Sequence, residues 1–451
     1  MLLYLIILLE FKLSVLAVEP EYSVCNVRIC KCDKLTGSQN FEFRNWTVKV
    51  KEGETVQELW NIECRCTRRT KVLSFGRSYG RTVIPKAVNH FSISNCLYVT
   101  LSAGSFGSQA GQEIHLKDIA SLNVEKWAFR RDSISMRLIK LENIGNLVVH
   151  SEAFTGIHDE NHIYFHNVTW NYVRTRTFSN ISLIKRMELK SVKVNEFGSL
   201  SFWKVDNIEE FHILGSNKEN TSCNIDRINS DALSFTSFNF SIFQCKIKLL
   251  RSDAIHISAN FAYFVENEIG TLESNSLGST FNELQFCRNE VNKFNSGSFS
   301  RLYGNRSENS SVIFVLQGNT FHTVGINAMD LGDENSVQYF HVLDNAFDCE
   351  CKNLSWFTVI YRQVSLGRAS TYFELLLDES ICSEHHDILV ASQHNVNKCD
   401  PDMREKTGNP FTDLEPLFII PVSIAAFLLL VCVFCRCCLK FRCSRQGGDF
   451  V

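Results

Sequence analysis

A repeated pattern of apolar residues restricts the possible folds of this chain more than any other feature. In the stretch FNELQFCRNEVNKFNSGSF, residues 281–299, Leu284 and Phe286 alternate with polar residues, and Asn289 follows three residues later. The stretch ends on a small residue followed by an apolar one, Ser298 and Phe299. The two preceding copies begin at residues 262 and 240, so the three copies are spaced 22 residues apart. A fixed period of this length is typical of a solenoid.

The same order of positions identifies twelve copies, separated by steps of 18 to 30 residues. Apolar residues at alternate positions predict a very short strand with one inward face. Stacked copies bury a continuous core that no single copy makes alone. The 35 Phe residues predict a core that stacks large flat side chains. The strands are predicted to start at Leu73, Phe91, Ile114, Ile139, Ile163, Met187, Phe211, Phe240, Ala262, Leu284, Phe314 and Phe340.

One position of the repeat, where the chain leaves the strand, carries Asn or Cys. An amide there can both donate to and accept from backbone groups that the turn leaves unpaired. Cys is small and apolar, so we expect the cysteines at this position to be buried free thiols. The residues are Cys96, Cys223, Cys245, Asn267, Asn289, Asn319 and Asn345.

Both ends of the chain carry membrane signals. Residues 2–9 are apolar, and Val15 and Ala17 suit cleavage of a signal peptide over residues 1–17, although an uncleaved start is the alternative. Residues 417–435 predict a transmembrane helix rather than a buried core helix. Basic residues follow this span, which by the positive-inside rule places the N-terminal part outside. We therefore expect a single-pass type I protein of the plasma membrane.

Cysteines and glycosylation sequons agree with an extracellular part. Of the 18 Cys, 13 precede the predicted span, where an oxidising compartment permits disulfides. An odd number there leaves a free or intermolecular thiol, for which Cys287 is the candidate. All eight Asn-x-Ser/Thr sequons also precede the span. They are Asn45, Asn167, Asn180, Asn220, Asn239, Asn305, Asn309 and Asn353.

The pattern L-x-L-x-x-N/C-x-L resembles the extracellular leucine-rich repeat proteins over residues 70–400. The chain departs from that family by using Phe, Ile and Val where Leu is usual, and by lacking Asn in several early copies. The resemblance implies a horseshoe solenoid of short parallel strands, with repeats over 71–345. It also implies cysteine-containing caps over 18–70 and 346–400 and a stalk over 401–416. A right-handed parallel β-helix is the alternative architecture.

The same resemblance implies the disulfides of the caps. The stretch LDNAFDCECKNLSWF is similar to the family's C-terminal cap and implies the pairs Cys349–Cys382 and Cys351–Cys399. Cys25, Cys30 and Cys32 look like an N-terminal cap that Cys64 or Cys66 closes.

The composition argues against nucleic-acid binding, and the motifs argue against catalysis. The net charge of −3 excludes a strongly basic nucleic-acid binder. Gly76–Gly80 fits G-x-S-x-G, but no helix pattern follows Ser78, as a nucleophile elbow requires. His385 and His386 lack metal-ligand spacing. We expect no enzyme activity, no cofactor and no metal.

The outward strand positions are the predicted binding surface, because the concave face of a horseshoe commonly binds ligands. The early copies place charged and His residues there, including His166 and His212, for which a solvated surface is the simpler interpretation. The His residues predict weaker binding near about pH 5.5. The later copies place apolar and aromatic residues there, which favour a protein-binding patch: Phe243, Phe261, Tyr263, Val265, Ile313, Val315 and Tyr339.

The predicted cytoplasmic tail, residues 436–451, is too short for a signalling domain. Cys435, Cys437, Cys438 and Cys443 are candidates for palmitoylation and contact with membrane lipid. Asp449, Phe450 and Val451 resemble a ligand of a PDZ-type adaptor. The expected function is adhesion or a receptor or co-receptor role, with an extracellular protein or an opposing cell-surface protein as partner. The alternatives are a carbohydrate-active β-helix enzyme and a shed structural matrix protein.

Overall fold

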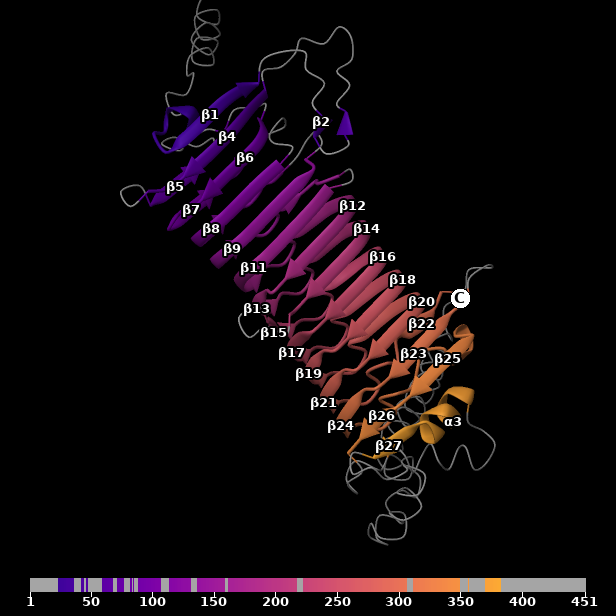
Figure 1. The fold of residues 1–451 in the computed structure, drawn as a ribbon. Helices are drawn as coiled ribbons and strands as arrows, with labels where there is room; N and C mark the ends of the chain where they lie inside the picture. The colour runs from indigo at the N-terminus through magenta and orange to yellow at the C-terminus, as the bar shows by residue number, and fades with distance from the viewer. Residues whose placement is uncertain are drawn as a thin grey trace, which may run out of the picture. The chain divides into compact units, whose positions relative to one another are not determined.

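The chain forms a parallel β-solenoid of about 11 turns, seen as a ladder of strands in Figure 1. The computed structural model describes residues 23–35, 42–43, 46–47, 59–67, 71–76, 82, 84, 88–106, 113–130, 136–158, 161–216, 222–305, 311–348, 356 and 370–382. Each strand pairs in parallel with its equivalent in the next turn, so the repeat of the sequence becomes a repeat in space.

Each coil of the solenoid contains three strand segments, which we call A, B and C. In one coil, β18 (Ile255–Val265) holds segment A over 255–259 and segment B over 261–265, and β19 (Glu268–Leu272) is segment C. Two successive residues, Asn260 and Phe261, are only half-buried, and the alternation of buried residues shifts by one position there. Segments A and B therefore have separate inward sets, Ile255 and Ile257 in A and Ala262 and Phe264 in B.

Neighbouring segments fuse into one strand in different ways along the chain. Segments B and C are fused in β8 (Glu113–Val124), β9 (Leu138–Val149) and β11 (Asn161–Val173). Segments A and B are fused in β12 (Phe178–Lys190), β14 (Phe202–Leu214), β16 (Leu233–Phe243), β18 and β20 (Leu277–Cys287). Separate A segments are β10 (Phe154–Thr155) and β22 (Leu302–Gly304), and separate B segments are β4 (Leu59–Arg65), β6 (Val88–Ser94), β23 (Ile313–Gln317) and β25 (Tyr339–Leu343).

The remaining strands are mostly C segments. They are β5 (Val72–Phe75), β7 (Tyr98–Leu101), β13 (Lys193–Phe197), β15 (Cys223–Ile228), β17 (Cys245–Leu250), β19, β21 (Glu290–Phe294), β24 (Thr320–Val324) and β26 (Asn345–Phe347). At the ends, β1 (Cys30–Leu35) pairs antiparallel with β4, and β27 (Ser380–Cys382) pairs with β26. A small hairpin joins β2 (Glu42–Phe43) and β3 (Trp46–Thr47).

The predicted register is confirmed from Phe91 onward. Phe91 pairs with Ile114, Ala262 with Leu284, and Phe314 with Phe340, and each predicted start in between also lies opposite the next one. The first predicted copy is wrong. Leu73 belongs to a C segment and pairs with Val99, whereas Ile62 lies opposite Phe91. C segments also alternate apolar and polar residues, so alternation alone does not separate them from B segments.

In the N-terminal coils, a column of phenylalanine rings runs through the core where the A segments begin. Phe106, Phe129, Phe154 and Phe178 stack on one another at centroid distances of 5.0, 4.7 and 5.1 Å, and Phe202 continues the column at 4.7 Å. These distances match the spacing of about 4.8 Å between neighbouring strands. The prediction that the core stacks flat side chains is thus confirmed.

A second column, of asparagines, fills the corner between segments B and C. Asn267, Asn289, Asn319 and Asn345 are each at most 2% exposed. The Nδ2 of Asn289 donates to the Phe264 carbonyl at 2.8 Å, and its Oδ1 accepts from the backbone N–H of Asn267 at 3.0 Å. The predicted role of these amides, pairing backbone groups that the turn leaves free, is confirmed.

The cysteines at the same corner are disulfide-bonded, so their prediction as free thiols is wrong. Cys223 pairs with Cys245 and Cys96 pairs with Cys66, with Cα–Cα distances of 4.7 and 5.0 Å. Equivalent positions of stacked coils lie about one strand spacing apart, which falls in the range that a disulfide spans. Stacking therefore brings together cysteines that are 22 and 30 residues apart in sequence.

Disulfides also close the N-terminal end. Cys25 pairs with Cys32 and Cys30 with Cys64, which leaves Cys66 for the first coil-to-coil bridge. At the other end, Cys382 is buried and disulfide-bonded, whereas Cys349, Cys351 and Cys399 lie outside the described ranges, so the predicted pairs of this cap stay predictions. Trp356 is buried and its ring centroid lies 5.2 Å from that of Phe347, so it covers the end of the core.

Helices are few in the described part of the chain. Those whose bounds lie in this part are the 3-10 helices η1 (Val24–Asn26) and η2 (Glu334–Ser336) and the α-helix α3 (Thr371–Asp378). Among the described residues no helix is long and apolar enough to cross a membrane. The predicted signal peptide, transmembrane span, palmitoylated cysteines and PDZ-type tail lie outside these residues.

Candidate recognition face on the B segments

The outward residues of the B segments form three parallel columns, which we call the recognition face. In the coil of β18 they are Phe261, Tyr263 and Val265. Because the B segments pair without a shift over most of their length, each outward residue lies beside its equivalents in the neighbouring coils. All nine predicted binding residues lie on this face: His166, His212, Phe243, Phe261, Tyr263, Val265, Ile313, Val315 and Tyr339.

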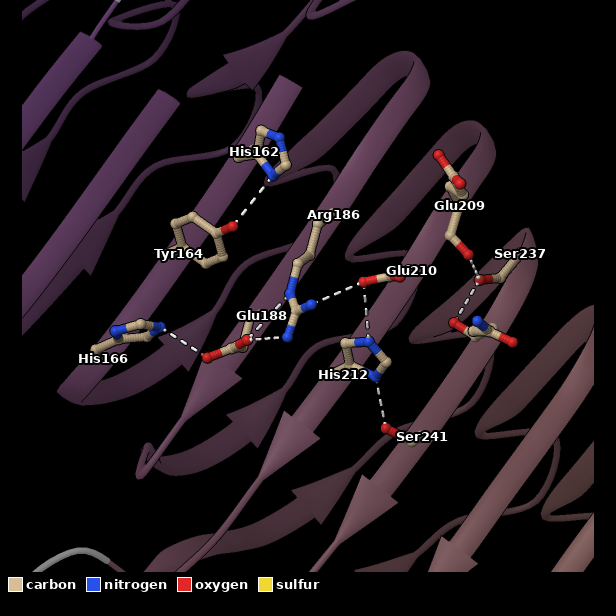
Figure 2. Close-up of polar contacts among 11 residues, drawn as sticks. His162, Tyr164, His166, Arg186, Glu188, Glu209, Glu210, His212, Ser237 and Ser241 are labelled. Carbon is tan, nitrogen blue, oxygen red and sulfur yellow. Dashed lines mark hydrogen bonds and ion pairs between the residues drawn. The ribbon is translucent and has the colours of Figure 1, made fainter. Parts of the chain in front are cut away.

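The N-terminal half of the recognition face is an ionic network that crosses several coils (Figure 2). Arg186 lies at its centre, 2.7 Å from Glu188 on its own strand and 2.8 Å from Glu210 on the next. The Nε2 of His166 lies 2.9 Å from the other oxygen of Glu188. The side chain of Glu188 is only 9% exposed, so this carboxylate is charged, nearly buried and held from two sides.

The partners of Glu188 change its acidity. The contacts with His166 and Arg186 lower the pKa of the Glu188 carboxyl to about 2, although burial alone would raise it. A lowered pKa means that the folded chain favours the charged form. These contacts therefore keep Glu188 ionised. The attraction between the Glu188 carboxylate and its partners is lost only in strong acid, where the carboxylate is protonated.

The pKa values of two histidines in this half are lowered as well, which for an imidazole favours the neutral form. Burial, helped by the nearby Arg186 charge, lowers the pKa of His212, whose Nδ1 lies 2.7 Å from the Ser241 hydroxyl. Burial also lowers the pKa of His115, despite its contact with Glu142 at 3.2 Å. Both imidazoles therefore stay neutral to a lower pH than a free histidine does. If they carry the predicted weakening of binding in acid, that weakening begins at a lower pH than a free histidine would give.

The C-terminal half of the recognition face carries aromatic and aliphatic side chains. Phe261 and Tyr263 lie with ring centroids 6.4 Å apart and planes only 2° from parallel. Phe238 packs edge-on against Phe261 at 5.4 Å and is itself 47% exposed. Tyr339 is 60% exposed at the far end of the patch. Large aromatic side chains held on a regular sheet are typical anchors of protein interfaces.

Phe238 was missed at the sequence level. It belongs to none of the predicted outward positions because it precedes segment B, at the junction with segment A, where the alternation shifts by one residue. Its position becomes clear once the shift is known, since Asn260 and Asn282 occupy the equivalent place in the next two coils, where both are half-buried whereas Phe238 is exposed.

A polar strip separates two apolar parts of this half. Glu283 and Gln285 contact each other, and Cys287 follows on the same strand. Cys287 is half-buried and is the one free cysteine in the described part of the chain. Burial raises the pKa of its thiol, which reduces its reactivity at neutral pH.

Four of the eight sequons lie in the described ranges. Asn167, Asn180 and Asn305 are exposed. Asn239 is half-exposed on the recognition face itself, between Glu210 and Phe261 of the neighbouring coils. Asn45, Asn220, Asn309 and Asn353 lie outside the description. A glycan on Asn239 would stand at the border between the ionic and the aromatic half.

The two stretches that were considered and rejected as a nucleophile elbow and a metal site lie almost wholly outside the described ranges. No group of three or more His, Cys, Asp or Glu residues in them is arranged to hold a metal ion. Gly76 of the G-x-S-x-G stretch directly follows β5, whereas Ser78 and the pair His385 and His386 lie outside the description. The N-terminal end of the recognition face is hollowed into a groove of about 520 Å³ beside Lys31, Glu63 and His90.

Comparison with known proteins gives no relative for this chain. No protein-family model matches it, and neither the curated proteins nor the solved structures contain a significant match.

Proposed function

We propose that this chain is a cell-surface glycoprotein of the leucine-rich repeat type that binds another protein through the aromatic half of its recognition face. It is anchored in the plasma membrane as a single-pass type I protein and acts in adhesion or as a receptor or co-receptor. Its partner is an extracellular protein or a protein on an opposing cell.

The observation that carries this proposal is the cluster of Phe238, Phe261 and Tyr263 on one rigid sheet surface. A soluble protein gains nothing from exposing such rings, and contiguous exposed aromatic residues mark interaction sites. The strands beneath them are fixed by backbone pairing on both sides. The rings are therefore presented with little loss of conformational freedom on binding.

The assignment to leucine-rich repeats rests on the asparagine column, the spacing of the copies and the cysteine-bearing ends. The parallel β-helix is the alternative, and the scarcity of helices among the described coils favours it. A carbohydrate-active enzyme on such a helix needs free carboxylates grouped on one face. Glu142, Glu188 and Glu210 on the recognition face are instead each paired with a cation.

Proximity labelling of intact cells tests the proposal. The full-length chain, fused to a labelling enzyme at its N-terminal side after the predicted signal peptide, is expected to mark a small set of extracellular proteins. Recovery of the chain in the medium rather than at the surface would favour the shed matrix protein. Equal labelling of all surface proteins in proportion to their abundance would contradict a specific partner.

A further inference from the structure

A cavity of about 440 Å³ lies on the A segments, away from the columns of the recognition face. Its walls come from β10, β12 and β14 and from the corners that precede the A segments. Three of the corner residues, Trp127, Glu152 and Arg176, come from successive coils, because each donates its backbone N–H to the corner residue of the next coil. The cavity is therefore a product of the stacking.

Charged side chains fix both indole rings of this cavity. The Arg176 guanidinium lies 5.1 Å from the centre of the Trp203 ring, and the Lys126 ammonium lies 4.4 Å from that of Trp127. The Nε1 of Trp127 also donates to Glu152 at 2.9 Å. Cation–π contacts of this kind hold a ring in place before any ligand arrives.

The cavity contains a glycosylation sequon in its own wall. Asn180 lines the cavity, is exposed and begins the sequence Asn180–Ile181–Ser182. Its neighbour Ser179 lies directly opposite Trp203 on the next strand, and strands in a sheet are about 4.8 Å apart. Because Asn180 and Trp203 both line this cavity, a sugar attached to the Asn180 amide starts at the cavity that holds the Trp203 ring.

The chemistry of the walls suits a saccharide. A sugar ring offers apolar C–H surface together with hydroxyl and acetamide groups that donate and accept hydrogen bonds. The indoles of Trp127 and Trp203 provide apolar surface, the Arg176 guanidinium donates, and the Glu152 carboxylate accepts. The volume falls in the range of small-molecule sites. A covalently tethered ligand also has an effective concentration of about millimolar without any external source.

We propose that the N-linked glycan of Asn180 folds back onto the chain and occupies the cavity between Trp127 and Trp203. The core of this glycan then belongs to the surface of the solenoid. The glycan of Asn167 provides the contrast. Asn167 is exposed within β11, where its Nδ2 donates to the Oδ1 of Asn143, and it does not line the cavity.

Site-resolved deglycosylation tests this proposal on the full-length chain, produced in a eukaryotic secretory pathway. The undenatured protein is treated with peptide N-glycosidase, and mass spectrometry follows the release at Asn180 and Asn167. We expect release at Asn180 to be about fivefold slower than release at Asn167, which corresponds to a docking free energy of ~1 kcal/mol. Trp203→Ala should remove most of that difference, and denaturation should remove all of it.

A second pair of variants separates docking from folding defects. Ser182→Thr keeps the sequon and the hydroxyl that contacts His158, whereas Ser182→Ala abolishes glycosylation. Iodide should quench tryptophan fluorescence more strongly in the Ser182→Ala chain than in the Ser182→Thr chain. If Trp203→Ala fails to fold, the release assay is repeated with Trp127→Leu, because Trp127 is 38% exposed. An unoccupied Asn180, equal release rates in the native chain, or rates that neither tryptophan variant changes would overturn the proposal.

Discussion

The Nδ2 of Asn289 donates to the Oδ1 of Asn319 across a distance of 3.1 Å, although 30 residues separate the two in sequence. Asn319 holds the same position one coil later, and it repeats the contact toward Asn345 at 2.9 Å. Each amide also bonds to the backbone of neighbouring coils. The column thus ties successive coils together along the C-terminal half of the solenoid.

Replacing Asn289 with Ala should destabilise the chain strongly. The substitution leaves the backbone N–H of Asn267 and the carbonyl of Phe264 without their partner in a buried corner. A buried group left without its partner costs about 1–3 kcal/mol, so we expect a total loss of about 3–5 kcal/mol. The midpoint of urea denaturation measures it. Asn292→Ala is the matched control, because Asn292 is exposed on the same coil, and it should change the midpoint little.

Thiol labelling should distinguish the cysteines at the corner from Cys287. In unreduced, denatured protein, iodoacetamide should modify Cys287 but leave Cys96, Cys223 and Cys245 unmodified. Reduction before labelling should make all four reactive. Breaking the Cys223–Cys245 bridge by Cys223→Ala and Cys245→Ala together should cost about 3 kcal/mol, because the bridge closes a loop of 22 residues. Labelling of Cys223 without reduction would show that this bridge is absent.

The ionic half of the recognition face should make stability depend on pH in the acid range. The pKa of Glu188 falls from 4.5 to about 2 on folding, so the charged carboxylate contributes stability above about pH 4.5 that is lost as the pH falls toward 2. The shift corresponds to about 3 kcal/mol. Glu188→Gln should therefore destabilise the chain by about this amount at pH 7, and the difference from the unmodified chain should nearly vanish at pH 2.

Denaturant titrations at the two pH values provide this measurement. Glu283→Gln is the control, because Glu283 contacts the neutral amide of Gln285 rather than a cation. A Glu188→Gln defect of the same size at both pH values would mean that the loss comes from packing and not from the charge.

The inward side of the fold was predictable because the repeat fixes it. Leu284 and Phe286 alternate with polar residues, and Asn289 marks the corner, so the register of this coil and its neighbours follows from the sequence. The first coil was misplaced because Leu73 and Phe75 alternate equally well within a C segment. The step of 18 residues to the next copy, the shortest in the series, was the available sign of that error.

The contacts between coils were harder to predict. Whether two cysteines at equivalent positions bond depends on the distance between coils, which is a property of stacking and not of either residue. The same holds for the ionic network, since Arg186 lies beside Glu210 only because the two strands pair without a shift at that point. Aligning the copies in columns would have indicated both the disulfides between coils and the ionic network. The position of Phe238, in contrast, depends on a shift in alternation that the repeat pattern does not show.

The central claim, that the aromatic half of the recognition face binds a protein partner, is tested most directly by two matched variants. Tyr263→Asp places a charge in the cluster, and Tyr172→Asp makes the same change at a 42% exposed position on a C segment. Both full-length chains are compared with the unmodified chain by proximity labelling on intact cells, after surface expression has been equalised. The account predicts that Tyr263→Asp lowers labelling of the specific neighbours at least about tenfold and that Tyr172→Asp leaves it unchanged. Undiminished labelling with Tyr263→Asp, or an equal loss with both variants, would contradict it.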